Sequence, residues 1–247
     1  MSNMRVAVIN YCHYPNPSNM SAWQALMDRQ PAQAKQALEH GATIVYQLGF
    51  DDIKNTPFYL ANRKVLDTPR GAGLWAWKPY IILMTMLETC LSYDAYIYLD
   101  VDVGIKDSII PFAEITKTQD VAAIRTTYQQ ARFCKRDCSV AFGVDGGDYE
   151  KWYQVQAGIV AYANNCGAIA FLTDWLTACC NYHLISDEPS VEPNYIYYLD
   201  HRHDQALFTI MYHKYNYPIW PPALQAFTDM YPLPAWCQTE VEGEFSN

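Results

Sequence analysis

The sequence has no long apolar run. No window of its 247 residues reaches the roughly 20 consecutive apolar residues that a membrane-spanning helix needs. The chain opens on Met-Ser-Asn-Met-Arg and passes directly into a predicted strand at Val6–Asn10, without the apolar stretch and cleavage site of a secretory signal. We therefore expect a cytoplasmic protein without a transmembrane segment; peripheral contact with the inner face of a membrane stays open.

Positive charge is also scarce. The chain has 17 Lys and Arg against 26 Asp and Glu, which gives a formal net charge of −9 at pH 7. A chain this acidic repels the phosphate backbone of a nucleic acid, so we expect no nucleic-acid partner. An anionic ligand must then be held by a local basic group or by a metal ion.

Cysteine is present, but the sequence lacks the second pair of ligands typical of a zinc site. Of the eight Cys, Cys134 and Cys138 have a spacing that suits a metal, yet no second Cys/His pair answers them in a zinc pattern. Most of the others lie in or beside apolar segments, as buried thiols do: Cys12, Cys90, Cys166, Cys179 and Cys180. We therefore expect free thiols rather than disulfides or zinc.

What the sequence does contain indicates one α/β domain. Its composition is 51% hydrophobic and 17% charged, and neither an internal repeat nor a linker divides it. A strand at Val6–Asn10, helices at 21–29 and 31–40 and a strand at Ala42–Leu48 form a unit typical of a parallel sheet. We expect a single Rossmann-like domain over residues 1–247, with a mostly parallel central sheet flanked by helices and a frayed tail at about 235–247.

Two acidic residues follow a short apolar strand predicted at Ala95–Leu99. They are Asp100 and Asp102, separated by Val101. In an open α/β sheet the carboxyl ends of the strands border the ligand-binding crevice. Carboxylate oxygens there suit Mg²⁺ or Mn²⁺, which completes its coordination with water and substrate phosphates. Local turn bonding by Asp is the alternative, but the strand context favours a metal and diphosphate site.

Two further polar clusters are candidates for the same site. The segment Arg70–Tyr80 has two glycines that permit a tight backbone path, and its Arg70 and Lys78 are suited to hold a diphosphate or sugar hydroxyls. Its glycine spacing matches neither a Walker A loop nor a dinucleotide fingerprint. The segment Asp200–Gln205 combines two His, an Arg and two Asp, which suits acid/base chemistry or metal binding, although Asp204 would also serve as an ordinary helix N-cap.

Three other features leave two interpretations each. Tyr11 follows the first strand, where it either stacks on a base or caps the core. Gly158 lies inside a predicted strand at Gln154–Tyr162, where glycine marks a bulge or the close approach of another group. Residues 126–147 are polar and indicate either an irregular insertion near the substrate side or a solvated basic face.

Four segments together resemble the nucleotide-sugar glycosyltransferases of the GT-A fold, most closely small bacterial enzymes of polysaccharide and lipopolysaccharide assembly. In order they read RGAGLWAWKPY at 70–80, YLDVDV at 98–103, QAG at 156–158 and HRHDQ at 201–205. The resemblance spans Val6 to His213. It implies Mn²⁺- or Mg²⁺-dependent transfer of a sugar from a nucleoside diphosphate, which we expect to be UDP, to a hydroxyl of a glycan or lipid-linked glycan.

The resemblance also assigns donor and metal residues. The donor-binding residues that we expect are Tyr11, Arg70, Lys78, Asp100 and Asp102. The metal ligands that we expect are Asp100, Asp102 and His201. Many members of the family supply a third ligand from a His near the C-terminus, but this chain has no His after His213, so that part falls to His201, His203, His213 or water.

The acceptor side and the catalytic pair follow from the same resemblance. We expect Gln156, Gly158 and His203 on the acceptor side. Asp204 and Gln205 match an Asp-Gln pair that faces the transferred sugar in retaining members, so the resemblance leans towards retention. For inversion, a carboxylate such as Asp204 would instead take the proton of the acceptor hydroxyl.

Two other functions are alternatives. Phosphatases of the haloacid dehalogenase type also carry Asp-x-Asp after a strand, but on the first strand, and release phosphate from an aryl phosphate without any sugar nucleotide. A non-catalytic carbohydrate-binding protein of the same fold would bind sugar nucleotides without a metal or not at all. The acidic pair together with Lys78 favours the transferase.

Overall fold

The computed structural model describes residues 4–13, 20–220 and 227–229, so the tail that we expected to be frayed lies outside the described residues. Five strands form the central sheet, in the order β2-β1-β3-β6-β5. Their bounds are β1 Val6–Cys12, β2 Ile44–Gly49, β3 Ala95–Leu99, β5 Val121–Gln129 and β6 Tyr153–Ala163. Two short strands, β4 Val103–Ile105 and β7 Phe227–Asp229, pair separately in an antiparallel ribbon.

Four of the five strands of the central sheet run in the same direction. β1 is parallel to β2 and to β3, whereas β6 is antiparallel to both of its neighbours, β3 and β5. The expected α/β architecture with a mostly parallel sheet is therefore confirmed, with β6 as the single reversed strand. The reversal brings the start of β6 to the carboxyl end of β3, where Leu99 pairs with Ile159.

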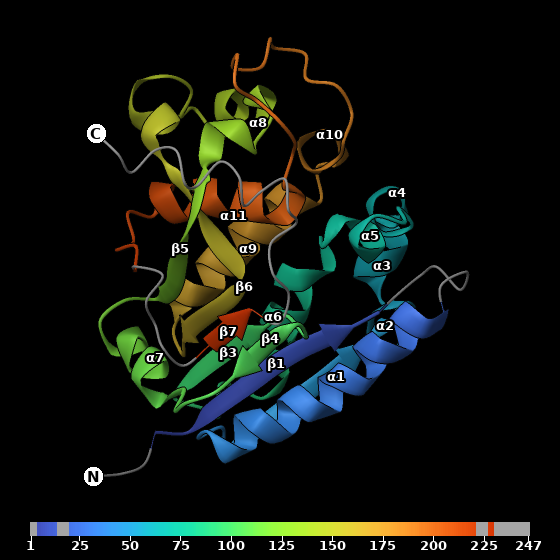
Figure 1. Cartoon of the computed structure of the whole chain (residues 1–247), viewed down its shortest axis with the longest axis vertical. Coiled ribbons are helices and arrows are strands. Elements are labelled where there is room, and N and C mark those ends of the chain that lie inside the picture. The colour runs from blue at the N-terminus through green and yellow to red at the C-terminus, as the bar shows by residue number, and fades with distance from the viewer. Residues whose placement is uncertain (1–3, 14–19, 221–226, 230–247) are drawn as a thin grey trace.

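Helices cover both faces of this sheet (Figure 1). Alternation along β1 sends Val6 and Val8 to one face and Ala7 and Ile9 to the other. Among the described residues, five helices cover the sheet: α1 Met20–Glu39, α6 Trp77–Glu88, α7 Ile110–Glu114, α9 Cys166–Cys179 and α11 His203–Lys214. α1 and α7 pack with Val6 and Val8, whereas α6, α9 and α11 pack with Ala7 and Ile9. Both faces of the sheet are thus buried, as their apolar strands predict.

Short helical turns connect these elements. They are α2 Phe50–Ile53, α3 Pro57–Ala61, α4 Arg63–Leu66, α5 Gly71–Leu74, α8 Arg136–Ala141, α10 Tyr182–Ile185 and the 3₁₀ turns Ile115–Lys117, Gln130–Arg132 and Gly147–Lys151. No helix among the described residues is long and apolar enough to cross a membrane.

Two expectations about local structure are wrong. We expected separate helices at 21–29 and 31–40, but α1 runs through Pro31 as one helix of 20 residues. The segment 126–147 is not simply irregular, because β5 continues to Gln129 and a 3₁₀ turn and α8 follow it. Packing of α1 against β1 and β2 outweighs the local signal of Pro31.

Candidate functional site

Asp100 and Asp102 lie in the turn that follows β3, at the carboxyl edge of the sheet. The turn is closed by a hydrogen bond from the Val103 amide to the Asp100 carbonyl at 3.0 Å. Both acidic residues line a cavity of about 300 Å³. The other lining residues come from the end of β1, from the segment around α5 and α6, and from the turn itself: Tyr11, Cys12, His13, Pro69, Gly71, Ala72, Trp75, Trp77 and Val101.

Lys78 is a buried cation held between two carboxylates. It lies in the first turn of α6 and its side chain is 4% exposed. Its Nζ is 3.2 Å from Asp100 Oδ1 and 3.1 Å from Asp204 Oδ2. Burial lowers the pKa of Lys78, but the two carboxylates more than offset this and raise it above its usual value. Lys78 is therefore protonated at neutral pH and places a positive charge beside Asp100, which lines the cavity.

Two further contacts hold Asp100, one at its carboxylate and one at its backbone. The Tyr98 hydroxyl donates to Asp100 Oδ1 at 2.7 Å, and the Asp100 amide donates to the Gly158 carbonyl at 2.9 Å. A Cβ at Gly158 would lie 2.3 Å from Asp100 Oδ2, so only glycine leaves room for the carboxylate in this position. The close approach that glycine in a strand signals is thus made by Asp100.

A buried polar chain holds the same turn from the other face. Gln33 of α1 donates from Nε2 to the carbonyls of Asp100 at 2.6 Å and Val103 at 2.7 Å. Its Oε1 accepts from Asn10 Nδ2 at 2.9 Å, and Gln30 donates to Asn10 Oδ1 at 3.0 Å. We did not predict a role for these residues. The available signal was Asn10, a polar residue in an otherwise apolar strand, because a buried amide requires partners.

The cavity wall formed by residues 70–77 has an unusual backbone. Ala72, Leu74 and Trp75 have positive φ angles of 50°, 55° and 57°. This path turns Trp77 towards Tyr11, and the two rings stack with centroids 4.0 Å apart. Tyr11 is buried and stacks on Trp77, so it caps the core, as one of the two interpretations expected. It also lines the cavity. Stacking of Tyr11 on a base stays a prediction.

Arg70 lies at the rim and forms two ion pairs. Its guanidinium is 3.1 Å from Asp187 Oδ1 and 3.0 Å from Asp200 Oδ2, and its side chain is 45% exposed. His203 Nε2 lies 3.2 Å from the same Asp187 oxygen. These contacts connect the 70–77 wall to the segment that precedes α11. A diphosphate bound by Arg70 would compete with two carboxylates.

Asp204 and Gln205 begin α11 but do not line the cavity. Burial raises the pKa of the Asp204 carboxyl to about 6, although Lys78 opposes the rise. The Gln205 amide donates to Gln154 Oε1 at 2.8 Å. In this structure Asp204 therefore faces Lys78, and Gln205 is bonded to β6. Gln156 of β6 is partly exposed.

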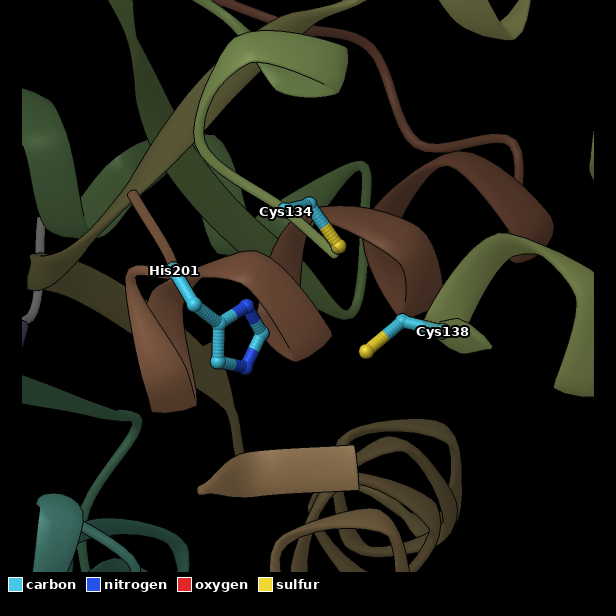
Figure 2. A group of neighbouring side chains, drawn as sticks. All are labelled: Cys134, Cys138 and His201. Atoms are coloured by element: carbon cyan, nitrogen blue, oxygen red, sulfur yellow. The ribbon is translucent and has the colours of Figure 1, made fainter. Parts of the chain in front are cut away.

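His201 is engaged elsewhere in the fold. Its Nδ1 accepts from the Lys135 amide at 3.3 Å, and its Nε2 lies 2.9 Å from the Leu184 carbonyl. The ring lies beside Cys134 and Cys138 (Figure 2). To bind a metal ion at the Asp100–Asp102 site as its third ligand, His201 would have to break both of these hydrogen bonds.

Comparisons with known proteins concern the fold. No model of a known protein family matches the sequence, and no curated protein matches it. Among solved structures, the chain is similar to a glycosyltransferase involved in glycosylation of the major capsid of PBCV-1, at 11% identity and a TM-score of 0.43 over 75% of this chain and 72% of that one. The chain is also similar to mouse xyloside xylosyltransferase 1, with 10% sequence identity and a TM-score of 0.43. The match covers 86% of this chain and 82% of that one.

A third similar structure is the galactosyltransferase LgtC in complex with donor and acceptor sugar analogues. It is 13% identical, with a TM-score of 0.40 over 83% of this chain and 70% of that one. All three are glycosyltransferases by name. Identities and TM-scores this low do not establish an activity, so the function is inferred from the residues of the site.

Proposed function

We propose that this chain is a glycosyltransferase that moves a sugar from a nucleoside diphosphate, best matched by UDP, to a hydroxyl of a glycan or lipid-linked glycan. The observation that carries the proposal is the cavity at the sheet edge, which Asp100 and Asp102 line and where Asp100 pairs with the buried cation Lys78. A phosphatase using Asp100 as nucleophile is disfavoured, because Lys78 and Tyr98 already bind that carboxylate.

The donor set fits a divalent metal. Two carboxylates at one cavity edge offer the hard oxygen ligands that Mn²⁺ and Mg²⁺ prefer. Because Gly158 has no side chain, the Asp100 carboxylate has room to take its position at this edge. Asp100 and Asp102 would hold the ion. When bound, it would neutralise negative charge on the diphosphate. The positive charge of Lys78 acts in the same direction, because charge on the leaving group grows as the sugar departs.

The lining of the cavity supports retention of configuration. In inverting members of the family that the sequence resembles, a carboxylate takes the proton of the acceptor hydroxyl. Among the described residues that line the cavity, the carboxylates are Asp100 and Asp102, both assigned to the donor. Asp204, the other candidate base, is buried against Lys78. We therefore infer that the Asp204–Gln205 segment supports the donor side, with Gln156, Gly158 and His203 as the proposed acceptor side. The anomeric configuration of the product, read by NMR, tests this.

A donor screen tests the activity. Sugar nucleotides are incubated with the protein and Mn²⁺, and both release of the nucleoside diphosphate and transfer to oligosaccharides are measured. We expect turnover with at least one UDP-sugar, loss of turnover in EDTA, and inactive but folded Asp100→Ala and Asp102→Ala variants. Near-normal activity of either variant, or phosphate release from an aryl phosphate without any sugar nucleotide, would refute the proposal.

A further inference from the structure

Cys134, Cys138 and His201 form a second cluster of metal-ligating side chains, separate from the proposed reaction. Their sulfur atoms and one ring nitrogen all lie within 4.8 Å of one another, and all three residues are buried. Figure 2 shows the Cys138 sulfur pointing towards the imidazole ring and the Cys134 sulfur pointing into the space between the ring and Cys138. The sequence offered no partner for the Cys134–Cys138 pair; the fold supplies one from the segment before α11.

The imidazole is already oriented as a metal ligand. The Leu184 carbonyl is only an acceptor, so His201 Nε2 carries the proton and donates to it at 2.9 Å. The lone pair is therefore on Nδ1, where it accepts a long bond of 3.3 Å from the Lys135 amide. Metal-binding histidines have this arrangement, with one nitrogen donating to a carbonyl and the other ligating.

An unpartnered oxygen lies at the same place. The Tyr149 side chain is 1% exposed, and its hydroxyl forms no hydrogen bond of ordinary geometry with the described residues, although the Cys134 thiol lies beside it. Tyr149 packs in the same buried core cluster as Cys134 and Cys138. A buried hydroxyl without a partner is costly, and a bound cation would satisfy it.

We propose that Cys134 Sγ, Cys138 Sγ and His201 Nδ1 bind a structural zinc ion, with the Tyr149 hydroxyl at the fourth position. Thiolate and imidazole ligands select zinc over the hard cations of the Asp100–Asp102 site. On binding, both thiols lose their protons to solvent, and Zn²⁺ with two thiolates and a neutral imidazole has no net charge. A neutral centre suits a buried position.

The zinc would join two segments that are distant in the sequence. Cys134 and Cys138 lie at the start of α8, and His201 lies two residues before the helix that carries Asp204. The ion would hold the segment before α11 against α8. That segment leads into Asp204, the carboxylate of α11 that pairs with Lys78. Its role is thus structural, at a closed site with protein ligands.

Metal analysis of the protein purified under reducing conditions tests the site. We expect one equivalent of zinc per chain, lost in Cys138→Ser and His201→Gln and kept in Cys179→Ser, a control at an equally buried thiol on α9. Replacing zinc with Co²⁺ should give a thiolate-to-cobalt charge-transfer band. Because carboxylates give no such band, Asp102→Asn should retain it.

Three results would overturn the proposal. One is wild-type protein with reduced thiols that contains no zinc and shows no thiolate band with Co²⁺. Another is a disulfide between Cys134 and Cys138 in the folded protein as isolated. A third is zinc or a thiolate band that survives both Cys138→Ser and His201→Gln. The wild-type measurement decides the question even if a variant does not fold.

Discussion

Lys78 determines the charge balance of the site. A single buried ammonium lies within 3.2 Å of carboxylate oxygens from Asp100 and Asp204, which lie on different elements. Buried ion pairs contribute little net stability when complete, but a buried charge that loses its partner is strongly destabilising. Lys78 therefore holds both carboxylates in place.

Replacement of Lys78 tests this balance. Lys78→Met should lower the free energy of unfolding by about 3–5 kcal/mol, because it leaves two carboxylates near the cavity without their cation. Urea unfolding measures the loss, and the double variant with Asp204→Asn should recover part of it. The control is Lys151→Met, whose ion pair with Asp148 is exposed and should change stability little. Equal losses for Lys78→Met and Lys151→Met would contradict the account.

Asp204 should give the stability a pH dependence of unusual sign. Its pKa is raised from 3.8 to about 6 by burial, so the folded protein binds more protons than the unfolded chain in that window. Its contribution to stability is therefore lost as pH rises from about 4 to 6. We expect metal-free wild-type protein to lose stability relative to Asp204→Asn there, by up to about 1.4 kcal/mol per pH unit.

Asp137 provides the matched comparison for that experiment. Burial raises its pKa, but hydrogen bonds from the amides of Glu192 and Val191 more than offset this and lower it to about 2. Its contribution is present above pH 4 and lost as pH falls towards 2, so Asp137→Asn should give a difference of the opposite slope. Thermal unfolding across pH measures both. Parallel curves for wild type and Asp204→Asn would show that Asp204 is not buried as described.

At the scale of elements, the site depends on how neighbouring strands and α1 meet at one turn. β6 brings Gly158 against Asp100, and α1 brings Gln33 under the same turn. The sequence predicted β3, its Asp-x-Asp end and Lys78 as a candidate donor residue, because each is a local pattern. It could not predict which residue of β6 or of α1 would meet the turn, because this depends on strand order and register.

Gly158→Ala tests the contact between β3 and β6. The new Cβ would lie 2.3 Å from Asp100 Oδ2 and displace the carboxylate. Loss of such support costs about 10- to 100-fold in metal affinity, so we expect a loss of that size in Mn²⁺ binding. The control is Gly49→Ala, where the nearest atom to an added Cβ is 3.4 Å away. Titration with Mn²⁺, followed by paramagnetic relaxation, measures both; unchanged affinity in Gly158→Ala would contradict the assignment.

Gln33→Leu tests the contact between α1 and the turn. The change removes a donor to the carbonyls of Asp100 and Val103 and the acceptor of the Asn10 side-chain amide. We expect a loss of about 1–3 kcal/mol in the free energy of unfolding, together with weaker Mn²⁺ binding. Gln24→Leu is the control, since among the described residues Gln24 bonds the exposed Asp28 in the same helix. A variant as stable as this control would argue against the polar chain as a support.

At the scale of the whole molecule, the site combines residues from distant parts of the chain. The ends of β1 and β3 line the cavity, β6 places Gly158 against Asp100, and α11 places Asp204 against Lys78. The sequence predicted the class of fold and the sheet edge that carries the cavity, but not the reversal of β6. His201 illustrates the remaining limit: residue type alone suggested the Asp100–Asp102 site, whereas chain folding places the ring beside Cys134 and Cys138. Long-range pairing, and not local pattern, decides such assignments.

Calorimetric titration of UDP in the presence and absence of Mn²⁺ tests the central claim most directly. Wild-type protein and the control Asp107→Ala, at an exposed position near the turn, should bind UDP with Mn²⁺. Removal of Mn²⁺, or Asp102→Ala, should weaken binding at least about tenfold, which is about 1.4 kcal/mol. UDP binding that is indifferent to Mn²⁺ and to Asp102→Ala, or no nucleotide binding at all, would contradict a metal-dependent donor site at this edge of the sheet.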